Sequence, residues 1–411
     1  MTFVRDVECW LSGPADPAEF PYPAVVAEYL RVGKHFVTKD VLAALDHARA
    51  KLPVGSGPGL LRLRRFLDIA LDKWDGCYDY HTYLALPILA APTGAAPDEA
   101  ARDRDRRLLH LLVDLIQFEL AAHSGATDLL PVQRPDRARL AKRLRLAVRA
   151  ARPALARCHP DRRVTVTDPL AAADDLRAAV EVTDAERLDL RLSMLPVYVI
   201  HDEYLFIRVL QMYESTFALL VVLLRAARTA LAGGSAALAT GHLVRATEAL
   251  TEAGPLFSLL ATMQPESFRT FRAYTEGASA IQSHSYKLVE SLCRTPDPDR
   301  LGSAAYRSVP EVRRQVLGGQ ATLDQAYRRA VDGGLLTPAA RTLVADRMGG
   351  FAAALTTWRR THHRLAVRML GEAPGTGYTE GTPYLGAVRS LPVFRTVPPA
   401  PPGEPSAGPA H

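Results

Sequence analysis

One long apolar stretch near the middle of the chain constrains the fold most strongly. The string RLSMLPVYVIHDEYLFIRVLQMYESTFALLVVLLR, within residues 188–225, is the most apolar part of the sequence. Its longest unbroken apolar run, Phe217 to Leu224, is far shorter than the roughly 20 residues that a membrane-spanning helix needs. We therefore expect a buried core helix that begins after Pro196.

The rest of the chain predicts the same kind of structure. No segment shows clean alternation of polar and apolar residues, and Ala, Leu and Arg are abundant, so the expected fold class is all-α. Residues 134–163 carry many arginines, but Leu140, Leu144, Ala147, Val148 and Ala151 keep helical spacing and predict one buried stripe. Further helices are expected over 60–74, 108–122, 237–260 and, as a pair, 309–370.

The net charge and the cysteine content bear on two questions: whether the protein binds nucleic acid, and in which cellular compartment it resides. A net charge of +6 is small for 411 residues, and no aromatic residues interleave the basic ones in 134–163, so we expect no nucleic-acid partner. The cysteines, which are scattered without metal-finger or disulfide spacing, are Cys9, Cys77, Cys158 and Cys293. The N-terminus MTFVRDVECW lacks an apolar signal region. A soluble cytoplasmic protein without a membrane partner is expected.

The stretch from Trp358 to Leu385 combines a histidine pair, a helix end and a glycine-rich loop. Trp358 and His362 are four residues apart and share one helical face, whereas His363 is turned away by about 100°. Gly371 is expected to end the helix. A neutral imidazole on a rigid helix is what a haem iron needs as its axial ligand. Alternatively, both histidines belong to a half-exposed helix among arginines.

Four segments in order along the chain carry recognisable motifs. They are YDYHTYL (78–84), HDEYLFI (201–207, followed by Gln211 and Glu214), PESFRTFRAY (265–274, followed by QSHSYK at 282–287), and Trp-Arg-x-x-His at 358–362 with the GTG loop at 375–377. Together they resemble the tryptophan 2,3-dioxygenase family, and the last segment is similar to that family's proximal haem region. The matches extend over roughly 300 residues.

This resemblance implies the fold and its divisions. We expect a helical bundle of the tryptophan 2,3-dioxygenase type, with extra N-terminal helices in residues 1–76 and a haem-binding oxygenase domain over 77–395. Residues 90–187 have no counterpart in the family pattern and are expected to be a helical insertion. The proline-rich tail, 396–411, is expected to be disordered.

The resemblance also implies the roles of particular residues. His362, beside Trp358, is the expected axial ligand of haem b, which would use Fe(II) and O2. Ala366 stands where some related proteins have a haem-tethering cysteine, so the haem is expected to be held non-covalently. Residues expected to bind an aromatic amino acid are Arg272 at its carboxylate, Thr376 at its amino-acid end, Phe206 and Phe268 at ring surfaces, and Tyr80 and Tyr83. In the family the segment of these two tyrosines reaches a neighbouring subunit, which implies a homo-oligomer, a dimer or tetramer.

One departure from the family pattern bears on the chemistry. Aligning HDEYLFI with the family puts Leu210 where the distal histidine would stand, and leucine can neither accept a hydrogen bond from an indole N–H nor act as a base. The leading hypothesis is a haem-dependent dioxygenase of L-tryptophan or a substituted tryptophan. The alternatives are a haem-dependent mono-oxygenase of an aromatic amino acid such as tyrosine, and a non-catalytic haem-binding or scaffold protein.

Overall fold

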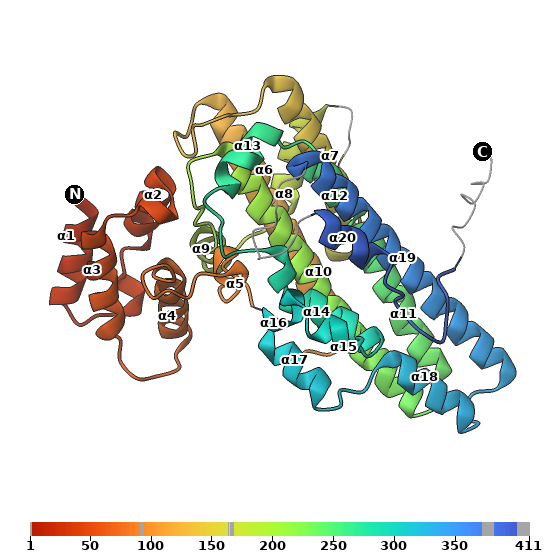
Figure 1. Cartoon of the computed structure of the whole chain (residues 1–411). Helices are drawn as coiled ribbons and strands as arrows, with labels where there is room; N and C mark the ends of the chain where they lie inside the picture. Colours follow the sequence, from red (N-terminus) through yellow and green to blue (C-terminus); the bar gives the residue numbers. More distant parts are fainter. Residues whose placement is uncertain (1, 91–93, 163, 165–167, 372–381, 401–411) are drawn as a thin grey trace. The chain divides into compact units, whose positions relative to one another are not determined.

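The fold is built from helices throughout the part of the chain that the structure describes. The structure, a computed structural model, describes residues 2–90, 94–162, 164, 168–371 and 382–400 (Figure 1). Within these ranges the extended pairing is confined to one isolated parallel bridge between Val132 and Ile200. The prediction of an all-α protein is therefore confirmed.

The described chain forms two compact units that interleave along the sequence. Unit 1 comprises residues 1–93, 105–212 and 258–282, and unit 2 comprises 94–104, 213–257 and 283–411. Helix α10, His201–Ala232, contributes its first residues to unit 1 and its remainder to unit 2. The boundaries expected at residues 76 and 395 stay predictions, because these units follow contacts rather than chain order.

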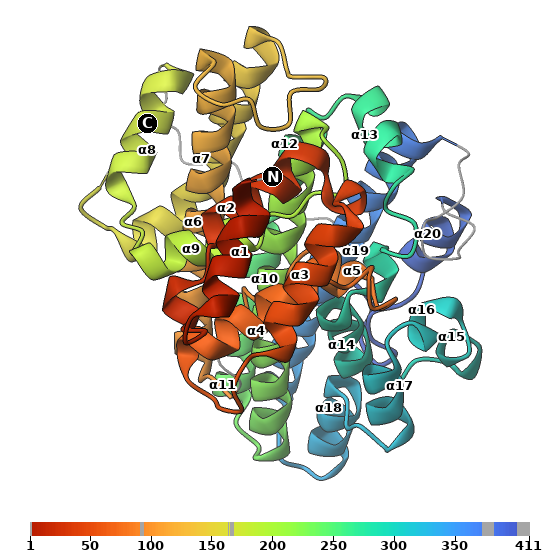
Figure 2. The same cartoon turned by 90° about the vertical axis from the view of Figure 1, so that its left-hand side faces the viewer.

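Unit 1 holds the N-terminal helices and most of the segment expected to be an insertion. Figure 2 shows α1 to α4 grouped together. Its helices are α1 (Thr2–Ser12), η1 (Pro17–Glu19), α2 (Tyr22–Val32), η2 (Lys34–Phe36), α3 (Lys39–Ala50), α4 (Pro58–Ala70), α5 (Tyr80–Tyr83), most of α6 (Pro97–Ser124), α7 (Arg137–Cys158), α8 (Pro169–Ala179), α9 (Asp184–Leu192), α13 (Pro265–Arg272) and η3 (Ala280–Gln282).

The N-terminal region, residues 1–76, contacts the rest of unit 1 closely around Gly33. Gly33 has a φ of +85°, and a Cβ there would lie 2.7 Å from the carbonyl oxygen of Val197, so only glycine fits. The next residue, Lys34, donates its backbone N–H to the carbonyl of Pro196 at 2.8 Å. Phe36 then contacts the ring of Tyr198 at a centroid distance of 5.4 Å. The N-terminal helices are therefore packed against the segment that leads into α10.

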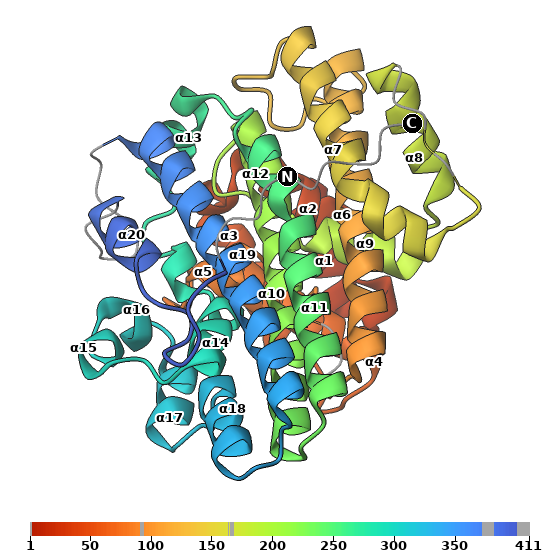
Figure 3. The same cartoon turned by 90° about the vertical axis from the view of Figure 1, so that its right-hand side faces the viewer.

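Unit 2 is organised on a pair of helices that lie side by side, α11 and α19 (Figure 3). On α19 the buried residues Val344, Met348, Phe351 and Leu355 follow helical spacing and form its core face. Helix α20 packs against α19. Besides the rest of α10, the helices of this unit are α11 (Ala236–Glu252), α14 (His284–Cys293), α15 (Pro298–Leu301), α16 (Ala304–Arg307), α17 (Pro310–Leu317), α18 (Leu323–Asp332), α19 (Pro338–Leu370) and α20 (Thr382–Arg389), and α12 (Gly254–Leu260) begins in unit 2 and ends in unit 1.

The expected helices are mostly present, with shifted ends. The core helix begins at His201 rather than directly after Pro196, and the segment expected over 237–260 is divided into α11 and α12 at Ala253. The range 309–370 holds three helices instead of two. The apolar stripe predicted for residues 134–163 is buried on α7, as expected. Gly371 ends α19 with a φ of +60°, also as expected.

Helix α10 is a buried core helix, although its composition would also suit a membrane span. It is long and apolar enough to cross a membrane by length and composition, but 83% of its most apolar 18-residue stretch is buried inside the protein. Buried polar residues, including His201, Asp202, Glu203 and Arg208, line its first two turns. A core helix of a folded domain has this pattern of burial.

The start of the proline-rich tail is ordered, which corrects the expectation of disorder for residues 396–400. The backbone N–H of Thr396 donates to Asp324 Oδ1 at 3.0 Å, and Val397 is 7% exposed. The N–H of Ala400 donates to the carbonyl of Gly349 at 3.0 Å. These long-range contacts hold a segment whose composition alone predicts flexibility. Residues 401–411 lie outside the described chain.

Candidate functional site

The side chains of Trp358 and His362 lie together in the second half of α19. Thr337 caps the start of this helix by accepting the N–H of Ala340, and Pro338 follows at the first helical position, where proline is favoured. The helix continues without a break to Leu370. The rings of Trp358 and His362 have centroids 5.2 Å apart, as their spacing of one helical turn predicts.

An aromatic shell surrounds the indole ring of Trp358. Its members come from four helices of unit 2 and lie within 6 Å of the indole, centroid to centroid: Tyr213 and Phe217 of α10, Phe257 of α12, Tyr286 of α14 and His362 of α19. The indole N–H of Trp358 is buried and has no hydrogen-bond partner among the described residues. A buried donor without a partner is uncommon, and a water molecule or a ligand group beside it would satisfy it.

The imidazole of His362 is held in the neutral form. The residue is half-buried, and Phe257 lies beside its ring at 6.3 Å. Burial, with a smaller effect of the neighbouring His363, lowers the pKa of His362 to about 4. The described part of the chain provides no hydrogen-bond partner for either ring nitrogen. His363 is on another side of α19, where its Nε2 would be 3.6 Å from a Cβ on Gly386. A neutral imidazole with a free lone pair is what metal coordination requires.

Lys287, on α14, is a buried cation that sequence analysis did not single out. Its side chain is among the buried residues, at 2% exposure, and its Nζ lies 5.2 and 5.7 Å from the ring centroids of Tyr286 and Tyr306. No carboxylate of the described residues forms an ion pair with it. Burial lowers the pKa of Lys287 to about 7. A buried ammonium without an ion pair favours the approach of an anionic group.

A network of charged residues fixes α14 beside Lys287. Glu290 accepts two hydrogen bonds from Arg300, at 2.8 and 3.0 Å, and one from the hydroxyl of Tyr306. Arg300 also donates to the hydroxyl of Tyr384, at the start of α20. The neighbouring cations outweigh the effect of burial and hold the pKa of Glu290 far below its usual value. Glu290 is hydrogen-bonded by Arg300 and acts on Lys287 through its charge, without a direct ion pair between the two.

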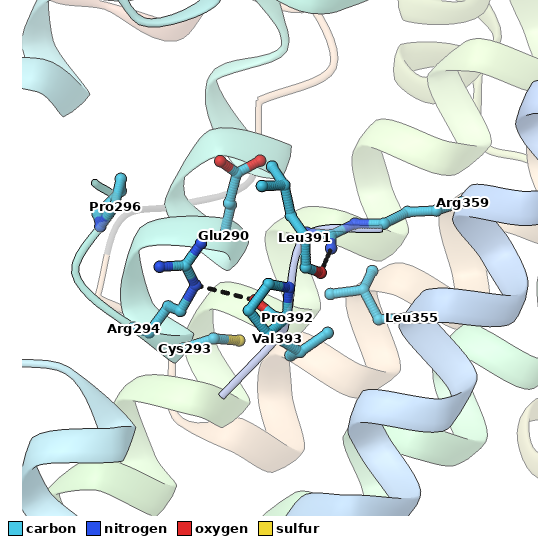
Figure 4. A pocket seen from close by; sticks show the side chains of 9 residues that line it. All are labelled: Glu290, Cys293, Arg294, Pro296, Leu355, Arg359, Leu391, Pro392 and Val393. Carbon is cyan, nitrogen blue, oxygen red and sulfur yellow. Dashed lines mark hydrogen bonds between the residues drawn. The ribbon is translucent and has the colours of Figure 1, made fainter. Parts of the chain in front are cut away.

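The small pocket drawn in Figure 4 is a place where arginine side chains hold the segment after α20, rather than a binding site. Arg359 donates to the carbonyl of Leu391 at 2.8 Å and to the hydroxyl of Tyr286 at 2.9 Å, while Arg294 donates to the carbonyl of Pro392 at 2.9 Å. These bonds use the cationic groups that a ligand would need. The residues lining this pocket are Glu290, Cys293, Arg294, Pro296, Leu355, Arg359, Leu391, Pro392 and Val393.

The expected ring-binding residues of unit 1 meet between α10 and α13. Phe206 and Phe268 are half-buried, with ring centroids 5.6 Å apart. Phe271, which was not expected, completes the cluster at 5.3 Å from Phe206 and 5.4 Å from Phe268. Leu210 is on α10 one turn after Phe206 and is 9% exposed. The helical spacing of Phe268 and Phe271 was visible in the sequence and was the available signal.

Arg272 is the last residue of α13, directly after this phenylalanine cluster. It is half-buried, and burial lowers the pKa of its guanidinium. Thr376, the other residue expected at the amino-acid end of a substrate, lies outside the described residues. Leu210, Phe206, Phe268 and Arg272 belong to unit 1, whereas His362 and Trp358 belong to unit 2.

Tyr80 and Tyr83 are buried within their own chain. Their exposed fractions are 4% and 3%. The hydroxyl of Tyr83 donates to Glu203 at 3.2 Å, and the N–H of Tyr80 donates to the side chain of Gln282 at 3.1 Å. Both residues therefore serve the packing of unit 1, and their expected reach into a neighbouring subunit stays a prediction.

Comparison with known proteins relates part of this chain to one family. A sequence model of the family described as tryptophan 2,3-dioxygenase matches residues 179–309. The tryptophan 2,3-dioxygenase of a Nocardioides species is 30% identical over 215 residues, which cover 45% of this chain and 79% of the relative. The enzymes of the same name from Pseudomonas aeruginosa and an Anaeromyxobacter species are each 26% identical, over 54% and 47% of this chain and 89% and 84% of the relatives. On this evidence the chain belongs to the tryptophan 2,3-dioxygenase family.

Proposed function

We propose that this protein is a haem-dependent oxygenase that adds both atoms of O2 across the indole C2–C3 bond of L-tryptophan or a substituted tryptophan. The observation that carries the proposal is the neutral imidazole of His362, half-buried against Trp358 on an unbroken helix of a family member. The expected cytoplasmic location and homo-oligomeric state are part of the same proposal.

The residues of unit 2 fit a haem. His362 would supply the axial nitrogen. The unpartnered indole N–H of Trp358 and the unpaired ammonium of Lys287 would suit the carboxylates of a porphyrin, because both groups need an acceptor. When bound, haem supplies the binding and activation of O2. Ala366 offers no thiol for a covalent tether, so the binding would be non-covalent.

The residues of unit 1 fit the substrate. Arg272 would hold the carboxylate through its planar fork, a geometry that lysine cannot reproduce. Phe206, Phe268 and Phe271 offer ring edges and faces for an aromatic side chain. Thr376 would act at the amino-acid end of the substrate, as the family resemblance implies. This set suits an amino acid with a large flat side chain better than an aliphatic one.

Leu210 favours a second candidate activity. Its buried, apolar side chain offers no acceptor for an indole N–H. A pocket with that wall tolerates an alkylated indole nitrogen or a ring that lacks an N–H, because no buried acceptor is left unpaired. Mono-oxygenation of an aromatic amino acid such as tyrosine is therefore the alternative to dioxygenation.

The mass change of a candidate substrate tests the proposal. The full-length protein is reconstituted with haem and incubated with ascorbate, O2 and L-tryptophan, 1-methyltryptophan or L-tyrosine. Gain of two oxygen atoms by an indole substrate supports dioxygenation, and gain of one supports the alternative. Absence of product from every aromatic amino acid, with haem bound, contradicts both and favours a non-catalytic haem protein.

A further inference from the structure

The guanidinium of Arg143 lies at a junction of three chain segments in unit 1. Its Nη1 donates to Glu119 of α6 at 2.7 Å, its Nη2 to Asp202 of α10 at 2.5 Å, and its Nε to the hydroxyl of Thr262 at 3.1 Å. Arg143 is 1% exposed, Glu119 2% and Asp202 0%. One residue of α7 thus joins two helices and the segment that precedes α13.

Asp202 links Arg143 to the start of α13 by hydrogen bonds. One of its oxygens accepts Arg143, and the other accepts the backbone N–H of Gln264 at 2.7 Å. Gln264 is the N-cap of α13, and its own side chain makes no capping bond. The first N–H groups of a helix need an acceptor from elsewhere. Asp202 supplies one from α10, so the start of α13 is fixed by an aspartate that Arg143 orients.

The residues expected to bind substrate lie within a few turns of this junction, on the first part of α10 and on the short helix α13. Phe206 and Leu210 follow Asp202 on α10 by one and two turns and share its face. On α13, which is about 12 Å long at 1.5 Å per residue, Phe268 comes one turn after Gln264 and Arg272 ends the helix. A small shift at Asp202 or Gln264 would therefore move Arg272 and Phe268 relative to Phe206.

The chemistry of the junction suits arginine and no other side chain. Three bonds leave the guanidinium in three directions of one plane, a geometry that the compact lysine ammonium does not offer. Glu119 and Asp202 raise the pKa of Arg143 against the opposing effect of burial. Apolar residues of similar volume are often as stable as a buried ionic group. The buried ionic group therefore serves to fix the relative positions of the segments it connects, and not stability alone.

We propose that Arg143 is a positioning residue for the substrate carboxylate site: through Asp202 and Gln264 it sets α13, and with it Arg272, against α10. The consequence for ligand binding rests on the proposed function. Arg143 lies in the segment 90–187, before the residues that match the family model at 179–309. The inserted helices would thus take part in shaping the substrate site.

Hydrogen exchange of the full-length protein tests the placement of α13. Arg143→Lys, which keeps the charge, and Arg143→Met are compared with Arg145→Lys, an exposed residue of the same helix. We expect the amides of residues 264 and 266–272 to exchange about tenfold faster in both Arg143 variants, with α19 unchanged, and no change in the Arg145 control. Unchanged exchange at these amides, or a uniform acceleration throughout unit 1, would overturn the proposal.

Ligand binding tests the consequence at Arg272. Dissociation constants are measured for L-tryptophan and for tryptamine, which lacks the carboxylate. We expect Arg143→Lys to weaken tryptophan about tenfold, a loss typical of slight misplacement, and to weaken tryptamine less, because tryptamine would lose only its ring contacts with α13. Equal weakening of both ligands contradicts an effect through Arg272. If the parent protein binds neither ligand, the proposed function fails, and the exchange of α13 alone decides the role of Arg143.

Discussion

The indole of Trp358 lies 5.2 Å from the imidazole of His362, centroid to centroid, and its N–H has no partner among the described residues. Both rings belong to one uninterrupted helix, so their relative position is fixed by the backbone. A bound porphyrin coordinated by His362 would meet an apolar aromatic surface with one free donor. The pair therefore predicts where haem binds and which histidine holds it.

Replacing His362 by alanine is expected to abolish haem binding. The Soret band of the reconstituted protein should be lost in His362→Ala, because no other imidazole on α19 shares the face of Trp358. His363→Ala is the matched control and should keep the band at full intensity. Full haem occupancy in His362→Ala would show that another residue binds the iron.

Lys287→Met should stabilise the apo-protein and weaken haem binding. Burial lowers the pKa of Lys287 from 10.5 to about 7, so the unfolded chain holds this proton more tightly than the folded chain. Stability is therefore lost as the pH falls from about 10.5 towards 7, and methionine removes this loss. Urea unfolding of the apo-protein near neutral pH should give a gain of roughly 1 to 3 kcal/mol.

Haem titration completes the test of Lys287. The affinity for haem should fall in Lys287→Met if the ammonium pairs with a porphyrin carboxylate. Lys142→Met, at an exposed position of α7, should change neither stability nor haem affinity. A less stable apo-protein with unchanged haem affinity would mean that Lys287 has a packing role only.

Glu203→Gln should remove a pH dependence of stability. Burial raises the pKa of Glu203 to about 8, although the N–H groups of Val197 and Tyr198 and the hydroxyl of Tyr83 oppose the shift. The folded chain therefore binds a proton more tightly than the unfolded chain. This contribution is fully present below about pH 4.5 and is lost as the pH rises towards 8, by at most about 1.4 kcal/mol per pH unit.

The measurement compares urea unfolding at pH 5, 6.5 and 8. The parent should lose stability across this series more steeply than Glu203→Gln, whose amide stays neutral. Glu266→Gln, at an exposed position of α13, should follow the parent. Parallel curves for the parent and Glu203→Gln would indicate that Glu203 is ionised in the folded protein.

Local hydrophobic spacing predicted the helices, but hydrogen bonds between residues far apart in the sequence could not be predicted. The apolar stripe of α7, including Leu140 and Leu144, followed from helical spacing alone and is buried. Arg143, on the same helix, is equally buried. Its partners Glu119 and Asp202 are 24 and 59 residues away, and no periodicity encodes such pairings. For the same reason the contact of Thr396 with Asp324 was missed and disorder was expected.

In the candidate site, too, local spacing was predictable and long-range packing was not. The shared face of Trp358 and His362 follows from a spacing of four residues on one helix. The shell around Trp358, which includes Tyr213 and Phe257, is assembled from separate helices by tertiary packing. Lys287 stands inside a recognised segment, but its burial without an ion pair depends on the neighbours that the fold supplies.

Arg272→Leu should weaken binding of amino acids through their carboxylate. Loss of a charged, hydrogen-bonded contact removes about 1.5 to 3 kcal/mol, which is roughly tenfold to a hundredfold in the dissociation constant of L-tryptophan. Tryptamine binding should change little. Arg269→Leu, on the exposed side of α13 beside Glu266, is the matched control and should bind tryptophan as the parent does. Unchanged tryptophan affinity in Arg272→Leu would remove this residue from the pocket.

Leu210→His should make the protein discriminate between substrates with and without an indole N–H. Leucine at this buried position leaves the N–H of tryptophan without an acceptor, so the parent should turn over L-tryptophan and 1-methyltryptophan with similar kcat/KM. An imidazole offers an acceptor for the N–H and none for the N-methyl group. The ratio of kcat/KM values should therefore shift towards tryptophan by about tenfold, the value of one hydrogen bond. Leu210→Met, which keeps the wall apolar, should leave the ratio unchanged. A ratio unaffected by histidine would mean that residue 210 does not face the ring nitrogen of the substrate.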